Sequence, residues 1–280
     1  MHGKRWLFWK KISQIAVYVL ATLAVFLSIA PIVYLALTSF KEPELTFAIP
    51  PVWNFAPTSE NYQEVLSSTN FDKYFLNSFV TAISTTAIAL VLGTLAAYGF
   101  SRFRFRGDFW LRMSSLIPQM LPPIAIVVPL YVLFSRLDWI DTRQSLIISY
   151  LTFTVPLSIW MMIGFFDDVP VELEEAAVVD GCGPWKIFFT VILPLIKPGL
   201  AAAAIFTFRI AWNEFILALV LTNRITRTLP VATTIYLTDA GVEWGNITAM
   251  GTLVALPAII FTFLAAKQLI AGLTAGAVKG

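Results

Sequence analysis

The chain has 280 residues, of which 58% are hydrophobic and only 13% are charged, and its mean hydropathy is +0.78. Soluble domains usually carry about 25% charged residues, so this composition excludes a water-soluble protein and indicates an integral membrane protein. The formal net charge of +2 is too small to indicate nucleic acid as a partner.

Cysteine and histidine each occur once, as Cys182 and His2. A single cysteine excludes an internal disulfide and a Cys-based metal cluster, and a single histidine argues against the usual zinc sites and histidine-dependent catalysis. The C-terminal "GLTAGAVKG" lacks the GxxxxGK[ST] pattern of a nucleotide-binding P-loop. We therefore expect no enzyme activity and no cofactor or metal bound by this chain.

The N-terminus combines a basic start with a long apolar stretch at residues 12–38. This stretch is longer than the apolar region of a signal peptide and has no convincing small-residue cleavage site. A membrane helix needs about 20 apolar residues. The pattern thus predicts a retained first transmembrane helix.

Apolar stretches of similar length recur along the chain and predict five more transmembrane helices. They lie at about 74–99, 113–135, 144–166, 199–222 and 247–270. The third contains Pro118, Pro122, Pro123 and Pro129, so we expect it to be kinked or partly unwound. Gly93 and Gly99 in the second favour close packing against another helix. The fold class is an all-α integral membrane protein with six transmembrane helices.

Lys and Arg concentrate in the loops on one side of the predicted membrane, which indicates the cytoplasmic side. The richer set comprises Lys4, Arg5, Lys10, Lys11, Arg102, Arg104, Arg106, Arg112, Lys186, Lys197, Lys267 and Lys279, and the poorer set Lys41, Lys73, Arg136, Arg143, Arg224 and Arg227. Both termini are then cytoplasmic. Residues 39–73 and 223–246 are external, and their composition favours ordered segments over flexible linkers.

The cytoplasmic segment at about residues 167–198 is acidic and rich in helix signals. Pro170 and Glu172 suit the first turn of a helix, and Gly181 suits a left-handed helix end. Pro184 would begin a second helix, which Pro194 would close. A short, rigid helix–turn–helix hairpin at the membrane surface follows from these signals.

Two alternatives remain open for this hairpin. Ala176 and Ala177, beside Glu175, would form a small, flat surface that lets another protein approach closely. An ordinary amphipathic helix with a solvated charged face at the membrane interface explains the same spacing. Cys182 in the turn offers a site for chemical labelling.

The hairpin sequence resembles the EAA signature of permeases from ATP-binding-cassette (ABC) importers. Glu175-Ala176-Ala177 is followed after three residues by Gly181, and Val191 precedes Leu193-Pro194 with one residue between. Valine at this position, where the signature has isoleucine, is a mild departure. "WNEF" at 212–215, Pro122-Pro123 and the final "GLTAGAVKG" are similar to MalG-type carbohydrate permeases.

This resemblance implies a type I importer permease fold in the cytoplasmic membrane of a bacterium or archaeon. Its partners would be a second, MalF-like permease, a homodimeric ATPase that binds ATP and magnesium, an external sugar-binding protein and the lipid bilayer. Sugar would cross as ATPase closure moves the hairpin, through Glu174, Glu175, Ala176, Ala177, Asp180, Gly181, Leu193 and Pro194. The tail residues Gly276, Lys279 and Gly280 would contact the ATPase.

The resemblance also orders the chain into three parts. Residues 1–73 hold the N-terminal tail, first helix and external segment. Residues 74–270 form the core permease domain. Residues 271–280 form the C-terminal cytoplasmic tail.

Three polar residues fall inside the fifth predicted span. Charges at such depth are costly unless paired or hydrated, and so they mark a pathway or a structural contact. Arg209 and Glu214 lie five residues apart, about 140° around a helix, and need not pair. Asn213 and Glu214 are candidates for binding sugar hydroxyls. A bond to the partner permease is the alternative.

Other functions fit the sequence less well. An importer of another solute, such as glycerol phosphate, shares every feature above. An ion-coupled secondary carrier would be expected to show two repeated halves with broken helices, and only the third span contains the prolines for a break. A membrane enzyme would need a metal motif or reactive pair, and HExxH is absent.

Overall fold

The computed structural model describes the backbone of residues 2–46, 48–68, 70–239 and 241–277, and the side chains of 13–46, 48–67, 70–239 and 241–263. The chain divides into two compact units. One unit contains the chain up to residue 69 together with 233–253, and the other contains 70–232 and the chain from 254 onward. Each unit is described by itself.

The first unit is built on a long helix and a small cluster of short elements. Its helices are α1 (His2–Thr38), α2 (Pro43–Thr46), α3 (Glu60–Ser68) and the 3-10 turn η2 (Thr233–Tyr236), followed by the strands β1 (Leu237–Thr238) and β2 (Gly241–Val242) and the start of α15 (Trp244–Ala277). Buried Asn61 donates hydrogen bonds to the carbonyls of Ser39 and Lys41, each at 2.9 Å. The segment after α1 is therefore an ordered structure.

Helix α1 exposes apolar side chains in every direction from Ser13 to its end. A helix that is apolar all round is stable only where protein or lipid covers it. The stretch Ser13–Thr38 is long and apolar enough to cross a membrane. Lipid is thus its natural environment.

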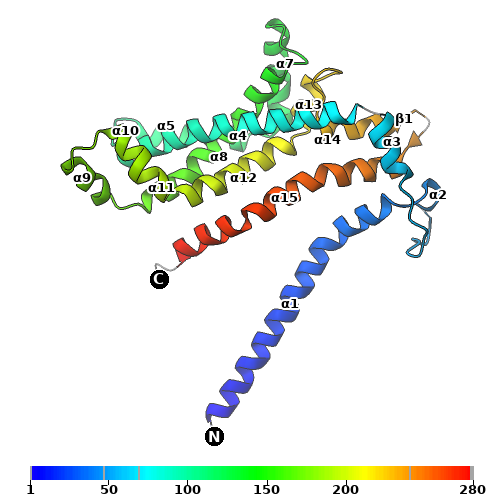
Figure 1. Cartoon of the computed structure of the whole chain (residues 1–280), viewed down its shortest axis with the longest axis horizontal. Coiled ribbons are helices and arrows are strands. Elements are labelled where there is room, and N and C mark those ends of the chain that lie inside the picture. The colour runs from blue at the N-terminus through cyan, green and yellow to red at the C-terminus, as the bar shows by residue number, and fades with distance from the viewer. Residues whose placement is uncertain (1, 47, 69, 240, 278–280) are drawn as a thin grey trace. The chain divides into compact units, whose positions relative to one another are not determined.

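The second unit is a bundle of the helices α4 (Phe71–Arg102), α8 (Arg143–Asp167) and α12 (Lys197–Trp212), which lie side by side (Figure 1). The other helices of this unit are α5 (Asp108–Ser114), α6 (Ile117–Met120), α7 (Pro123–Arg136), α9 (Glu172–Val179), α10 (Pro184–Ile187), η1 (Phe188–Ile192), α11 (Leu193–Leu195), α13 (Ile216–Leu221) and α14 (Leu229–Ala232). Small residues let α4 and α8 approach closely: a Cβ atom built on Gly93 would lie 2.3 Å from Ser158 Oγ.

The structure supports the predicted transmembrane helices. In the described residues, four helices are long and apolar enough to cross a membrane, or up to six if each bent helix pair counts as one span. One bent pair joins Asp108–Met120 to Pro123–Arg136 at 95°. This break falls at Pro122-Pro123, which confirms the predicted kink, because proline lacks the amide hydrogen that would continue the helix.

The fifth predicted span is not one continuous helix, which corrects the expectation for 199–222. Helix α12 ends at Trp212 and α13 begins at Ile216. The Glu214 carboxylate accepts hydrogen bonds from the amides of Leu217 at 2.9 Å and Ala218 at 3.0 Å, satisfying the first turn of α13. This break contains no proline, and the Glu214 carboxylate caps the helix that follows it.

At the N-terminal end of α4, the loop that follows α13 is held by the carboxylate of Asp141 and by Asn77 of α4. Asp141, in a left-handed conformation with φ of 58°, accepts hydrogen bonds from the amides of Asn223, Ile225 and Thr226 at 2.9–3.0 Å. The Thr226 hydroxyl adds a fourth bond at 2.8 Å. From α4, Asn77 donates to the carbonyls of Ile225 and Arg227.

These bonds control the ionisation of Asp141. Partial burial raises the pKa of its carboxyl, but the hydrogen bonds from Asn223, Thr226 and Ile225 outweigh burial and lower the pKa to about 2. A carboxyl whose pKa falls on folding contributes stability at pH values above its unfolded pKa, and this contribution is lost as the pH falls toward 2.

Gly93→Ala should destabilise the bundle by about 1–3 kcal/mol, because the added methyl group overlaps Ser158 and forces α4 and α8 apart. The unfolding temperature in detergent measures this effect. Gly99→Ala is the matched control, since a Cβ atom there meets nothing within 4 Å. Equal unfolding temperatures for the two variants would contradict the close approach.

Asp141→Asn should loosen the loop at neutral pH, because it removes the charge while asparagine still tolerates a positive φ. Hydrogen exchange at the amides of Ile225 and Thr226 should speed up roughly tenfold. In the parent chain these amides should lose protection between about pH 4 and pH 2, and in the variant that pH dependence should vanish.

Asp138→Asn is the control for this experiment. Asp138 is exposed and also has a positive φ, of 54°. If both variants exchange at the same rate, charge at Asp141 does not hold the loop.

Candidate functional site

The acidic helix α9 ends as the sequence predicts. Glu172, Glu174 and Glu175 occupy its first turn, where carboxylates favour the positive end of the helix. Gly181 adopts a φ of +79°. The amides of Gly181 and Cys182 donate to the carbonyls of Val178 and Ala177, both at 2.9 Å, which is the hydrogen-bond pattern of a Schellman helix end. The left-handed conformation of Gly181 is thus confirmed.

The second arm of the hairpin differs from the prediction. Pro184 does begin a helix, α10, but Pro194 does not close the arm: it lies inside α11, and the chain turns at Ile196. Between them, η1 is a π-helix in which the amide of Leu193 donates to the carbonyl of Phe188. The wider π turn accommodates a proline that would clash with the preceding turn of an α-helix.

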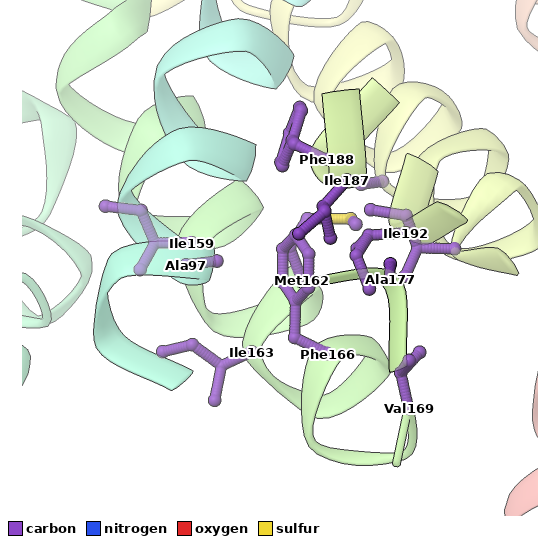
Figure 2. Packing of buried hydrophobic residues seen from close by; sticks show 12 residues of the cluster. Ala97, Ile159, Met162, Ile163, Phe166, Val169, Ala177, Ile187, Phe188 and Ile192 are labelled. Atoms are coloured by element: carbon purple, nitrogen blue, oxygen red, sulfur yellow. The ribbon is translucent and has the colours of Figure 1, made fainter. Parts of the chain in front are cut away.

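One face of the hairpin packs into the bundle. Figure 2 shows Ala177, Ile187, Phe188 and Ile192 pointing toward a buried cluster that includes Phe166 of α8. The members of this cluster are Ala97, Ile159, Met162, Ile163, Phe166, Val169, Ala177, Ile187, Phe188, Ile192, Ile196 and Ala203. The expected flat surface of two alanines is therefore wrong for Ala177, which is only 8% exposed.

The opposite face of α9 is exposed and mixes charge with apolar surface. Glu175, Ala176 and Asp180 are exposed, and Val179 is 87% exposed. Pro194 is also exposed, whereas Leu193 is half-buried against the cluster. The hairpin tip therefore presents an accessible surface of carboxylates and Val179.

Unlike the exposed residues of the hairpin, Glu174 points toward α4 rather than toward solvent. Its Oε1 atom lies 2.5 Å from Arg102 Nε, and its Oε2 atom accepts a hydrogen bond from the Tyr98 hydroxyl at 2.8 Å. Sequence reasoning missed Tyr98 and assigned Arg102 to membrane orientation. An arginine at the end of a span, with an acidic helix on the same side, was the available signal.

The polar residues of the fifth span do not pair with one another. Both oxygens of Glu214 are bonded to α13, and the Arg209 guanidinium lies 6.0 Å from the centre of the Phe206 ring. Asn213 is exposed, and its side chain donates to the carbonyl of Arg209. Buried Trp212 donates to the carbonyl of Val254 at 3.0 Å. This arrangement favours a structural role for Glu214 and leaves Asn213 accessible.

The predicted tail contacts cannot be placed. Gly276 falls within the backbone of α15, while Lys279 and Gly280 lie outside the described residues. Among the side chains that are described, no group of His, Cys, Asp and Glu could hold a metal ion.

Comparison with known proteins gives the hairpin a context. Residues 89–274 match the family described as "Binding-protein-dependent transport system inner membrane component". The match spans most of the second unit, including the hairpin and both bent helix pairs, Asp108–Met120 with Pro123–Arg136 and Pro184–Leu195 with Lys197–Trp212.

Two relatives and one solved structure cover nearly the whole chain. The trehalose/maltose transport system permease protein MalG of Thermococcus litoralis is 34% identical, over 96% of this chain and 98% of the relative. The trehalose transport system permease protein SugB of Mycobacterium tuberculosis is 37% identical, over 94% and 96%.

A chain of the bacterial ABC transporter that imports alginate, an acidic polysaccharide, superposes with a TM-score of 0.72 at 22% identity, over 92% of this chain and 96% of that one. It shows that the fold is that of an ABC importer permease. The chain therefore belongs to the binding-protein-dependent transport system inner membrane components, as a non-catalytic permease subunit of the MalG-like group.

Proposed function

We propose that this chain forms half of the translocation pathway of an ATP-driven sugar importer and couples ATPase closure to alternating access through the α9–α10 hairpin. The observation that carries the proposal is the hairpin itself. Its inner face is fixed in the bundle by Ala177 and Phe188, while Glu175, Ala176 and Val179 remain exposed for a partner.

The partners follow from what the chain lacks. It has no P-loop, so ATP and magnesium would bind to a separate, homodimeric ATPase and not to this subunit. A second, MalF-like permease would complete the pathway, and an external binding protein would deliver the solute. Relatives named for trehalose and maltose transport support a sugar as that solute.

The mechanism needs two states that bind the partners differently. ATP would close the ATPase pair, and the hairpin would move with it as a rigid body because both of its arms are helical and its tip ends in a fixed hydrogen-bond pattern. The breaks at Pro122-Pro123 and at 213–215 provide places where the spans can bend. Asn213, exposed at the second break, is the residue best placed to meet a sugar hydroxyl.

The proposed orientation places both termini and the hairpin in the cytoplasm. The uneven distribution of Lys and Arg supports it. Cys182 then faces the cytoplasm, and it is half-buried and the chain's single cysteine.

Gly181→Trp should abolish transport and the stimulation of ATP hydrolysis by the binding protein, while membrane insertion persists. A positive φ is unfavourable for any residue with a Cβ atom, and the indole would block the hairpin tip. Uptake and ATPase assays on the reconstituted transporter measure both effects. Gly183→Trp is the control, because Gly183 has an ordinary φ of −75°. Normal uptake with Gly181→Trp would refute coupling through the hairpin.

The solute can be identified by ATP hydrolysis in the purified complex with its binding protein. Trehalose and maltose should stimulate hydrolysis more than polyols or glycerol phosphate. If glycerol phosphate alone stimulates hydrolysis, glycerol phosphate is the transported solute and the assignment to a sugar is wrong.

A further inference from the structure

The cytoplasmic end of α4 is connected to the hairpin by one arginine. Arg102 is the last residue of α4, and its Nε atom lies 2.5 Å from Glu174 Oε1 in α9. Its Nη2 atom donates to the carbonyl of Val169, at 2.9 Å, in the segment between α8 and α9. The Arg102 side chain is thus bonded both to α9 and to the segment that leads into α9.

Neighbouring residues of α4 complete this connection. The Tyr98 hydroxyl donates to the second carboxylate oxygen of Glu174 at 2.8 Å. Ser101 donates to Asp167 at the end of α8. Both oxygens of Glu174 are therefore bonded to α4, at two positions one turn apart, which fixes the rotation of α9 as well as its distance.

The pair of Arg102 and Glu174 is shielded from water. The two side chains are only 8% and 13% exposed. The other ion pair in the described part of the chain, Arg112 with Asp108, lies within α5 and is more exposed. A buried ion pair is weak evidence of stability, but removal of one partner leaves a buried charge without compensation.

The remaining contacts of α4 with the hairpin are apolar. Within the hairpin, the Phe188 ring lies 5.2 Å from the Tyr98 ring, and Phe166 of α8 lies 5.5 Å from Tyr98, measured between centroids. Apolar contact has no preferred direction, so it holds the hairpin against the bundle but does not by itself set the rotation of α9. Helix α8 leads directly into the hairpin and α12 follows directly from it, whereas no part of the chain next to α4 joins the hairpin.

We propose that the Arg102–Glu174 bridge is the element that makes α4 follow the hairpin when the ATPase moves it. Arg102, Glu174 and Tyr98 are positioning residues in this scheme and do not contact the ATPase. The inference rests on the proposed coupling function of the hairpin, and it assigns to Glu174 a role different from that of exposed Glu175.

The first test measures rigidity directly. Spin labels are placed on native Cys182 and on Gly99→Cys, a position in α4 where an added Cβ atom meets nothing within 4 Å. In the assembled transporter, pulsed electron paramagnetic resonance should give a narrow distance distribution. Arg102→Gln and Glu174→Gln should broaden it. Arg104→Gln, at an exposed arginine two residues away, is the matched control.

The second test measures coupling as the ratio of ATP hydrolysis with binding protein to hydrolysis without it. Arg102→Gln should lower this ratio roughly tenfold, which lies within the usual range of coupling between two sites. Arg102→Lys keeps the charge without the forked geometry and should have a smaller effect. Tyr98→Phe, which keeps the ring contacts, should have the smallest, and these two variants decide the question if Arg102→Gln does not assemble.

The outcomes separate this inference from the function on which it rests. If Gly181→Trp removes stimulation while Arg102→Gln, Arg102→Lys and Tyr98→Phe behave like Arg104→Gln in both tests, the bridge has no positioning role and the hairpin still couples. If Gly181→Trp leaves stimulation intact, the proposed function fails first.

Discussion

The structure depends on the rule that backbone polar groups must find partners wherever water is excluded. Regular helix satisfies this rule, so each departure from regular helix needs its own compensation. The chain supplies it locally: Glu214 binds amides in the first turn of α13, and η1 widens the helix before Pro194. In the exposed loop that follows α13, Asp141 binds three amides in the same way. Irregular backbone is therefore concentrated where particular side chains or a wider helix can support it.

The breaks supported in this way divide the chain into rigid parts and parts that can bend. The bundle of α4, α8 and α12 is closely packed, and the hairpin is fixed to it by apolar contacts and by the Arg102–Glu174 pair. The chain bends between α6 and α7 and between α11 and α12, and the helix is interrupted between α12 and α13. A transporter needs both properties, because force must pass through stiff elements and the pathway must open at compliant ones.

The sequence predicted the features that local chemistry determines. Apolar length located the spans, paired prolines located the 95° bend, and Gly181 located the left-handed helix end. It did not reveal the break at 213–215, because a capping carboxylate looks like any buried charge until its amide partners are known. The burial of Ala177 and the pairing of Glu174 with Arg102 were missed for a similar reason: they depend on residues of other helices, and Arg102 lies 72 positions from Glu174.

Gly93 has a consequence for how the pathway can change shape. Ser158 occupies the space that a Cβ atom at Gly93 would take, so the surfaces of α4 and α8 interlock at that level. Relative motion along this seam would require the two helices to separate first. Under the proposed function, gating movements would therefore use other surfaces, such as the bent segments of this subunit.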